Sequence, residues 1–334
     1  MEKFADMTEK AIGTDINQVQ ITDLDHLKIG SGIKELLKVN LDAYFQNRAK
    51  DDSNASFGPV MLVGPSGTGK TVTAKAIHCE LANLCLIETN GEMMNNAAEL
   101  NSILITADKE TTIFIDECQA LKSKAQHILL TALSERKIYV RSSSNQKIKF
   151  AIPLSNFELI LSSTHEFQLQ DALRNRMRIY CRFDYYSIDE LIEIVKQRVD
   201  ALQWKYGSEE VLIEIAKRAK QTPRLALNRN LQMAWNVATS QDRDMITLDD
   251  VKQAFRLLQV DALGLDCLER SYLKELSKHK SMRLNVIASK IGLPRQTISS
   301  VIEPFLLRQE LIEKKNSDRV ITAKGREHSN NAVL

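Results

Sequence analysis

The sequence reads Gly64-Pro65-Ser66-Gly67-Thr68-Gly69-Lys70-Thr71 directly after a short apolar run at 60–63 and before a helical pattern at 70–84. This stretch matches GxxxxGK[ST] at every fixed position, in the strand-to-helix context that a phosphate-binding loop requires. Its glycines let the backbone wrap a phosphate, and the helix N-terminus adds a favourable field. We expect Lys70 to reach the β- and γ-phosphates of ATP and Thr71 to offer its hydroxyl to Mg²⁺; a Gly-rich turn without ligand is the alternative.

Two further apolar runs end in groups that suit the same chemistry. The run at 111–116 ends in Asp116 and Glu117, 46 residues after Lys70. The carboxyl ends of parallel strands open on one sheet edge, so Asp116 is predicted to hold the Mg²⁺ shell and Glu117 to polarise the attacking water. The run at 157–163 leads into Thr164, whose hydroxyl could contact the γ-phosphate or orient the water. A polar strand end is the simpler alternative for Thr164.

The order of apolar runs and helical patterns predicts an α/β fold with a parallel sheet covered on both faces. Within it, residues 137–152 contain two β-prone pieces around a polar tip, which predicts a protruding hairpin. After residue 187 the pattern becomes helical. Ser187 and Glu190 have the spacing of a capping box. Further helices are predicted at 209–221, 224–240 and 247–259, followed by a linker at 261–266.

Composition excludes several classes of protein. The chain has 334 residues, of which 43% are hydrophobic and 26% charged. These values argue against a disordered chain or a collagen-like repeat. The longest apolar runs fall short of the ~18 residues of a membrane span, and no secretory signal is visible, so we expect a cytoplasmic protein. The five cysteines are odd in number and form no CxxC pair, which predicts free thiols rather than disulfides or a zinc site.

The net charge of +2 hides two opposed parts. Residues 267–334 contain 13 Lys and Arg against 7 Asp and Glu, a net charge of +6, so residues 1–266 sum to −4. A mildly acidic body therefore carries a basic C-terminal module. This asymmetry favours an anionic partner for the C-terminal module, although a basic surface can also be merely solvated.

The chain resembles the AAA+ ATPases and, more narrowly, the RuvB family of Holliday-junction branch-migration motors. The resemblance covers roughly residues 20–328. It rests on Phe157-Glu-Leu-Ile-Leu-Ser-Ser-Thr164, Leu173-Arg-Asn-Arg176, Phe183-Asp-Tyr-Tyr186, Gln221-Thr-Pro-Arg224 and Val301-Ile-Glu-Pro-Phe305. It implies an AAA+ P-loop NTPase core with a parallel sheet, followed by an α-helical lid and a C-terminal winged-helix domain. The expected boundaries are an N-terminal arm at 1–20, the ATPase domain at 21–184, the lid at 185–262 and the winged helix at 263–334.

The resemblance also implies roles for single residues. Thr164 takes the first-sensor position and Arg176 that of an arginine finger acting on a neighbouring subunit, with a surface salt bridge as the alternative. Arg224 takes the second-sensor position in the lid, reaching back to the phosphates. Tyr186 is expected beside the nucleotide base, and Gly30 belongs to the element that closes over the adenine.

The basic C-terminal module is read as the DNA-binding domain of this resemblance. Residues 284–291, a break at 292–294 and residues 295–307 form a helix-turn-helix pattern, and residues 312–322 form a two-stranded wing. Phosphate contacts are expected from Arg295, Gln296, Lys314, Lys315, Arg319 and Lys324. Such contacts would be largely independent of DNA sequence and sensitive to salt. The alternative is a winged helix that docks a protein.

Several positions depart from the family pattern. His165 stands where the family has Arg, and Arg176-Met-Arg-Ile179 replaces Arg-Phe-Gly-Ile; Ser31 ends the Ile-Gly-Gln element. The hairpin, the family's docking site for RuvA, has a polar tip here, which favours a different adaptor protein.

These features predict a Mg²⁺-dependent ATPase that assembles as a homo-oligomeric ring, expected to be a hexamer, and that translocates or remodels double-stranded or branched DNA. One alternative is a nucleotide-switched recruiter or scaffold in a mobile-element or phage-defence system. A small-molecule kinase is the other.

Overall fold

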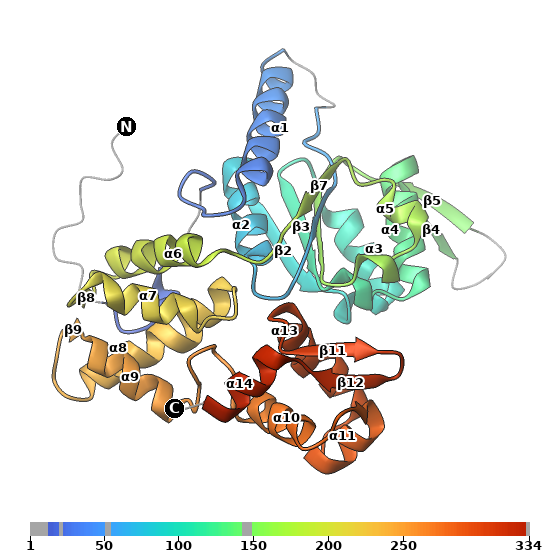
Figure 1. The fold of residues 1–334 in the computed structure, drawn as a ribbon. Coiled ribbons are helices and arrows are strands. Elements are labelled where there is room, and N and C mark those ends of the chain that lie inside the picture. Colours follow the sequence, from blue (N-terminus) through green and yellow to red (C-terminus); the bar gives the residue numbers. More distant parts are fainter. Residues whose placement is uncertain (1–12, 20–22, 51–54, 142–148, 332–334) are drawn as a thin grey trace. The chain divides into compact units, whose positions relative to one another are not determined.

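The computed structural model describes residues 13–19, 23–50, 55–141 and 149–331 (Figure 1). The chain divides into two compact units. One unit is Gln20–Tyr185, and the other combines Met1–Val19 with Tyr186–Leu334.

The Gln20–Tyr185 unit is built on a parallel sheet of five strands in the order β2-β3-β6-β1-β7. The strands are β1 (Val60–Val63), β2 (Cys85–Asn90), β3 (Thr111–Asp116), β6 (Glu158–Ser163) and β7 (Ile179–Arg182). The predicted strands at 60–63 and 111–116 are confirmed, and β6 begins one residue later than expected. Sequence reasoning missed the two edge strands, β2 and β7. The residues of β2 are all exposed or partly exposed, so they form no apolar run, and β7 is only four residues long.

Helices cover both faces of this sheet (Figure 1). Alternate residues of β1 enter different cores: Met61 and Val63 pack with α3 (Ala97–Thr106) and α4 (Ser123–Glu135). Val60 and Leu62 pack with α1 (Ser31–Ala49) and α2 (Lys70–Glu80). Helix α2 ends before the predicted residue 84, because Ala82 has φ of 53°, outside the helical region. Short helical elements complete the unit: η2 (Met93–Asn95), η3 (Cys118–Ala120), η4 (Glu166–Gln168) and α5 (Asp171–Arg174).

The predicted hairpin is present as the antiparallel pair β4 (Lys137–Arg141) and β5 (Lys149–Pro153). Ile138, paired with Ile152, is buried in the core beneath α4. The predicted polar tip, residues 142–148, lies outside the described residues. Tyr139 and Phe150 are 49% and 56% exposed on the strands, so the described part of the hairpin presents aromatic surface.

The lid forms a helical core after Tyr186. Its elements are α6 (Ile188–Ala201), β8 (Lys205–Tyr206), α7 (Glu209–Lys217), η5 (Leu225–Leu231), α8 (Gln232–Thr239), β9 (Met245–Ile246) and α9 (Leu248–Leu257). The capping box is confirmed: the Glu190 amide donates to the Ser187 hydroxyl at 3.2 Å, and the Ser187 amide donates to the Glu190 carboxylate at 2.8 Å. The helix predicted at 224–240 begins with a π-helical segment, η5, before α8. Trp204 and Trp235 stack at 4.4 Å in the lid core.

Part of the predicted N-terminal arm packs on the lid. Ile16, in η1 (Ile16–Gln18), is 2% exposed within the lid core. The Arg198 guanidinium donates to the carbonyls of Ile16 and Val19, each at 2.6 Å, and the Trp204 indole donates to the Gly13 carbonyl. Residues 13–19 therefore belong structurally to the lid, while the rest of the predicted arm lies outside the described residues.

The predicted winged helix is confirmed, with its own apolar core. Its elements are α10 (Cys267–Ser277), β10 (Met282–Arg283), α11 (Leu284–Ile291), α12 (Arg295–Thr297), η6 (Ile298–Ile302), α13 (Glu303–Arg308), β11 (Ile312–Lys315), β12 (Asp318–Ile321) and α14 (Ala323–Asn331). The helix predicted at 295–307 contains a π-helical segment, η6, directly before Pro304, which has no N–H to continue the α-helical ladder. β10 adds a third strand to the wing, beside β12.

The state of the cysteines is as the sequence predicted. All five cysteines are free thiols; Cys118 and Cys181 are buried, and burial raises the pKa of the Cys181 thiol to about 12. No helix in the described ranges is long and apolar enough to cross a membrane.

Candidate functional site

The phosphate loop connects β1 to α2 in a conformation that depends on glycine. Gly64 has φ of 148°, and a Cβ there would lie 2.4 Å from the Phe183 carbonyl oxygen. Gly67 and Gly69 also have positive φ, at 80° and 99°. The Lys70 ammonium donates to the carbonyls of Gly64 at 2.9 Å and Pro65 at 2.8 Å, so the cation lies inside the loop. Thr68 closes the turn by donating to the Pro65 carbonyl at 2.8 Å. The predicted loop residues 64–71 are thus brought together as a phosphate cradle at a helix N-terminus.

Thr71 and Asp116, the predicted metal pair, are adjacent in the structure. The Thr71 hydroxyl donates to Asp116 Oδ2 at 3.0 Å. Asp116 Oδ1 accepts the Ser162 hydroxyl and the Glu117 amide, the latter at 2.9 Å. These contacts follow from the strand order, since β3 and β6 are neighbours and Ile115 pairs with Leu161. A hydroxyl beside a carboxylate is the hard-oxygen donor set with which proteins bind Mg²⁺ alongside nucleotide phosphates, so the residues fit this ion.

Glu117 and Thr164 also meet, at the ends of β3 and β6. The Thr164 hydroxyl donates to Glu117 Oε2 at 3.0 Å. Glu117 has φ of 47° and ψ of 44°, a left-handed conformation that is uncommon for a residue with a side chain. The same Oε2 accepts the amide of Gln119, a residue that sequence reasoning did not single out. The sequence offered one signal for Gln119, which is that it follows Glu117 by two residues, just beyond the end of β3.

Two arginines, Arg174 and Arg178, flank the predicted finger Arg176, and the contacts of the three side chains differ. Arg174 pairs with Asp171 and lies over the Phe167 ring at 5.0 Å. Arg178 donates to the Ser56 carbonyl at 3.0 Å. Within the described part of the chain, the exposed Arg176 guanidinium forms no hydrogen bond or ion pair. Arg176 is therefore the arginine of this segment that is available to another molecule.

Three predicted nucleotide contacts are divided between the two units. Gly30 directly precedes α1 in the ATPase unit, and no atom lies within 4 Å of a Cβ placed on it. Tyr186 and Arg224 belong to the lid unit. Tyr186 is 7% exposed, and burial, with the nearby Glu190 carboxylate, raises the pKa of its phenol to about 12. Arg224 is exposed at the start of η5. Their roles at the nucleotide stay predictions.

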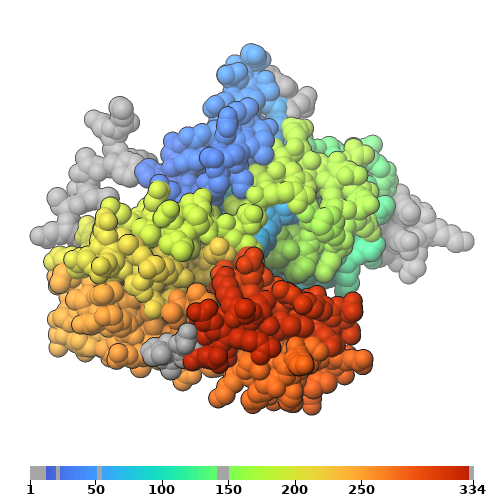
Figure 2. All heavy atoms as spheres, in the orientation of Figure 1, coloured from blue at the N-terminus to red at the C-terminus, as the bar shows by residue number. Residues whose placement is uncertain are grey.

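The predicted DNA-contacting residues divide into two groups. Arg295, Gln296, Lys315 and Lys324 are exposed. Arg319 is 11% exposed and makes a bidentate ion pair with the buried Glu303, at 2.8 and 3.1 Å. The Lys314 ammonium lies 3.2 Å from the same carboxylate. The wing therefore holds Arg319 against its own core, whereas Lys314 reaches the same carboxylate from the surface, with its side chain 45% exposed. The C-terminal part of this domain (red in Figure 2) is at the surface on the face shown.

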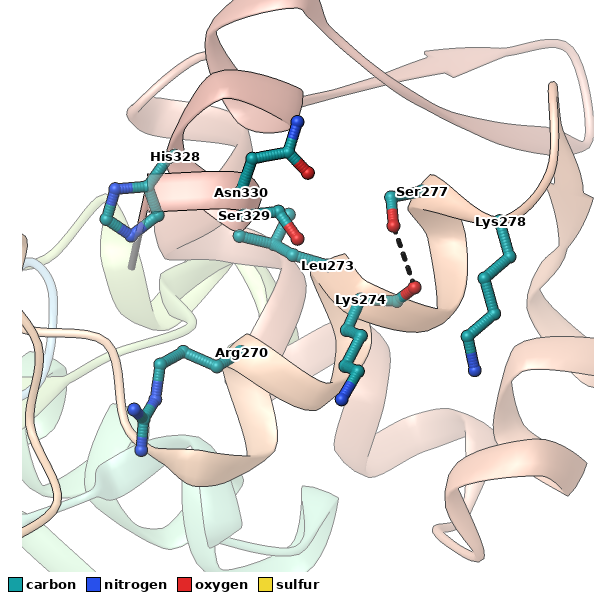
Figure 3. Close-up of a pocket in the computed structure, with 8 residues that line it drawn as sticks. All are labelled: Arg270, Leu273, Lys274, Ser277, Lys278, His328, Ser329 and Asn330. Carbon is teal, nitrogen blue, oxygen red and sulfur yellow. Dashed lines mark hydrogen bonds between the residues drawn. The ribbon is translucent and has the colours of Figure 1, made fainter. Parts of the chain in front are cut away.

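A basic hollow of about 510 Å³ lies between α10 and α14 of the winged helix (Figure 3). Arg270, Lys274 and Lys278 follow each other along α10 at the four-residue spacing of one helix face. The Arg270 guanidinium donates to the Gln259 carbonyl at 2.9 Å, and Lys278 pairs with Glu275. Among the described residues, Lys278 alone of these three cations pairs with a carboxylate, and Lys274 has no hydrogen-bond or ion-pair partner. The hollow therefore carries positive charge from Arg270 and Lys274 that no carboxylate compensates.

Three family models match the chain in succession. They are the Holliday junction DNA helicase RuvB P-loop domain at residues 23–183, the RuvB AAA lid domain at 186–261 and the RuvB C-terminal winged helix domain at 262–330. The RuvB subunit of the Holliday junction branch migration complex of Kosmotoga olearia is 29% identical over 325 residues, 94% of this chain and 92% of that protein. The same subunit of Staphylococcus haemolyticus is 32% identical over 276 residues, 81% and 82% of the two chains.

Solved structures agree with these matches. A structure of Thermotoga maritima RuvB, described as a Holliday junction branch migration motor, has a TM-score of 0.76 and 26% identity, covering 94% of this chain and 99% of that chain. A single-residue mutant of the same protein has a TM-score of 0.78 with 26% identity, covering 95% and 100%.

Proposed function

Because the chain belongs to the RuvB family, we propose that it is an ATP-driven motor that translocates or remodels double-stranded or branched DNA. The observation that supports this proposal most directly is the meeting of Thr71, Asp116, Glu117 and Thr164 at the carboxyl ends of β1, β3 and β6. These strands are neighbours in the sheet. A phosphate cradle, a metal pair and a water-orienting carboxylate are the parts that ATP hydrolysis requires.

In this proposal, each residue acts through its own contacts. Lys70 and the loop amides bind the β- and γ-phosphates, and Thr71 and Asp116 hold Mg²⁺. The ion, when bound, neutralises developing charge on the phosphate oxygens. Glu117 orients the attacking water and accepts its proton, while Thr164 steadies the Glu117 carboxylate. Tyr186 and Arg224 of the lid complete the nucleotide site at the base and the phosphates.

The active form in this proposal is a homo-oligomeric ring, for which we propose a hexamer. Arg176 is exposed and has no partner among the residues that the structure describes, which supports a role in trans, since it can reach a neighbouring subunit without breaking a described contact of its own chain. An arginine finger stabilises the charge of the transferring phosphoryl group and can be worth about 10³–10⁵ in rate. Hydrolysis then occurs at subunit boundaries.

We propose that DNA is bound through the winged helix, by its exposed cations Arg295, Lys315 and Lys324 together with Gln296. The net charge of +6 of residues 267–334 and the sequence-independent nature of phosphate contacts fit a motor that moves along DNA. The aromatic surface of the hairpin, at Tyr139 and Phe150, fits an adaptor protein. The adaptor differs from a conventional RuvA partner in this proposal, because the tip sequence is polar.

Mixing two inactive variants tests the proposal. We expect Lys70→Ala and Arg176→Ala each to lower DNA-stimulated ATP hydrolysis by at least about 10³-fold, the lower range of a finger's contribution. Mixed one to one, they should recover activity, because an Arg176→Ala protomer with an intact loop can face a Lys70→Ala protomer with an intact finger. In random assembly about a quarter of head-to-tail interfaces would be complete. No recovery at any ratio, with assembly intact by particle mass, would contradict a finger in trans.

A second measurement separates a motor from a nucleotide-switched scaffold. A motor's ATP turnover should rise when duplex DNA is added, and the rise should collapse between about 50 and 200 mM salt, since phosphate contacts release counterions. A scaffold would bind ATP and assemble without DNA-stimulated turnover. Family membership favours the motor over the scaffold and over a small-molecule kinase.

A further inference from the structure

The side chain of Gln119 links the ends of two strands at the candidate ATPase site. It follows Glu117 in η3, and its amide nitrogen donates to Glu117 Oε2. The same nitrogen donates to the Thr164 hydroxyl at 3.0 Å. Its carbonyl oxygen accepts the hydroxyl of Ser163 at 2.6 Å. All of these contacts are made by one amide that no motif of the chain required.

Chemistry dictates which way this amide points. An ionised carboxylate can only accept hydrogen bonds, so the donor nitrogen of Gln119 must face Glu117. The carbonyl oxygen then faces Ser163, whose hydroxyl has a proton to donate. Ser163 is itself held, because its oxygen accepts the His165 backbone amide at 2.9 Å. The amide therefore has one arrangement that satisfies both of its ends, and it is anchored to the end of β6.

The contacts distinguish the two oxygens of the Glu117 carboxylate. Oε2 accepts two donors, from Gln119 and Thr164. Oε1 accepts none from the residues that the structure describes. The Glu117 backbone is confined as well: a Cβ on Gly91 would lie 2.5 Å from the Glu117 carbonyl oxygen, and the neighbouring Cys118 is fully buried. The packed backbone of Glu117 and the two hydrogen bonds to Oε2 therefore both restrict rotation of the carboxylate.

We propose that Gln119 is a positioning residue of the ATPase reaction. It holds Glu117 Oε2 beside Thr164, which leaves Oε1 as the oxygen that accepts the proton of the attacking water. Gln119 thereby couples the end of β6, which carries the first-sensor Thr164, to the base on β3. This inference rests on the proposed ATPase function, and it adds a residue to that site that neither the phosphate-loop pattern nor the acidic strand end predicts.

The test replaces Gln119 by an apolar side chain of similar length. In the full-length protein with ATP, Mg²⁺ and duplex DNA, Gln119→Met should lower kcat by about 10- to 100-fold, the factor that a hydrogen bond to a charged group is worth. The KM for ATP should stay within about twofold, because Gln119 contacts the base and the sensor rather than the phosphate loop.

Gln126→Met is the matched control. Gln126 is 3% exposed in α4, and its amide donates to the Leu121 carbonyl and accepts the Gln170 amide, each at 2.8 Å. Within the described residues it forms no hydrogen bond with Glu117 or Thr164. This variant also loses a side-chain amide that is hydrogen-bonded at both ends, so it should lower the melting temperature while kcat stays within about twofold of wild type.

A second variant, Gln119→Glu, keeps the size and an acceptor for Ser163 but loses the donor toward Glu117 and adds a like charge. We expect its kcat to be at least as low as that of Gln119→Met. If Gln119 acted only as a structural link to Ser163, Gln119→Glu would retain more activity than Gln119→Met. That order would overturn the proposal even if the Met variant folded poorly.

The outcomes separate this inference from the function on which it rests. Wild-type kcat retained in Gln119→Met, or an equal loss of kcat in Gln126→Met, would refute the positioning role. Wild-type turnover no greater than that of Lys70→Ala would instead refute the ATPase function itself. A loss of kcat confined to the Gln119 variants, with KM unchanged, supports the proposal.

Discussion

Replacing Arg319 by Met should destabilise the winged helix strongly, because it leaves a buried carboxylate without its main partner. Glu303 is fully buried and accepts two hydrogen bonds from Arg319, at 2.8 and 3.1 Å. It also accepts the Tyr272 hydroxyl at 3.0 Å. Burial alone would raise the pKa of Glu303, but the hydrogen bonds from Arg319, Tyr272 and Lys314 outweigh it and hold the pKa below its usual value. The carboxylate is therefore charged at neutral pH, and Arg319→Met would leave that charge poorly compensated.

The expected magnitude follows from the partners that remain. Breaking a buried ion pair by removing one member costs about 3–5 kcal/mol. Lys314 stays near Glu303 at 3.2 Å, although its side chain is 45% exposed, so we expect the lower end, about 3 kcal/mol. Amide hydrogen exchange in the full-length protein is the assay, since it reports local opening without requiring two-state unfolding of the whole chain. Protection of the α13 and β12 amides should fall by about two orders of magnitude.

The double variant Glu303→Gln/Arg319→Met separates stability from DNA binding. It removes both charges, so it should regain much of the lost protection. If Arg319 also contacts DNA, the double variant should still bind DNA weakly. The slope of its log binding constant against log salt concentration should then be smaller by about one. Lys315→Met is the comparison, because its exposed ammonium pairs with Glu313 at 3.4 Å on the wing surface. Protection in Arg319→Met within about threefold of wild type would refute the reasoning.

Other predictions follow from single contacts. Gly64→Ala should weaken ATP binding more than about tenfold in a binding titration, because its φ is 148° and its Cβ would meet a backbone oxygen at 2.4 Å; Gly32→Ala, with nothing within 4 Å, should not. Ile16→Ala should destabilise the lid by about 2–5 kcal/mol, as expected for a buried side chain, measured by tryptophan fluorescence because both tryptophans lie in the lid. Burial raises the pKa of Asp250, but hydrogen bonds from Arg243 and from the preceding N-cap residue Thr247 outweigh it and lower the pKa to about 2. Because the folded pKa lies below the unfolded pKa of about 3.9, the ionised Asp250 stabilises the lid at pH values above about 3.9, and this stabilisation is lost as the pH falls toward about 2. Asp250→Asn should therefore reduce the change in the lid's free energy of unfolding across that pH interval.

The features that the sequence predicted correctly share one property: each is carried by contiguous residues. The loop at 64–71, the strand ending at Asp116 and the Ser187 capping box are set by neighbours within a few positions along the chain. Periodicity identified the hairpin and the wing for the same reason. One departure was also local in origin, since the left-handed Ala82 ended α2 before the predicted residue 84. The helix predicted at 295–307 is present and differs only by the π-helical segment at Ile298–Ile302.

By itself, the sequence determined the phosphate loop, the acidic strand end and the order of three domains, because these depend on short-range patterns of residue type. Only the tertiary structure decided which side chains meet. The strand order β3-β6-β1 brings Gln119 to Ser163 across 44 residues of chain. In the winged helix, folding turns Arg319 inward onto the buried Glu303. In the ATPase unit, Arg176 has no partner among the described residues. Such contacts depend on strand neighbours and burial, which a pattern of residues along one chain segment does not contain.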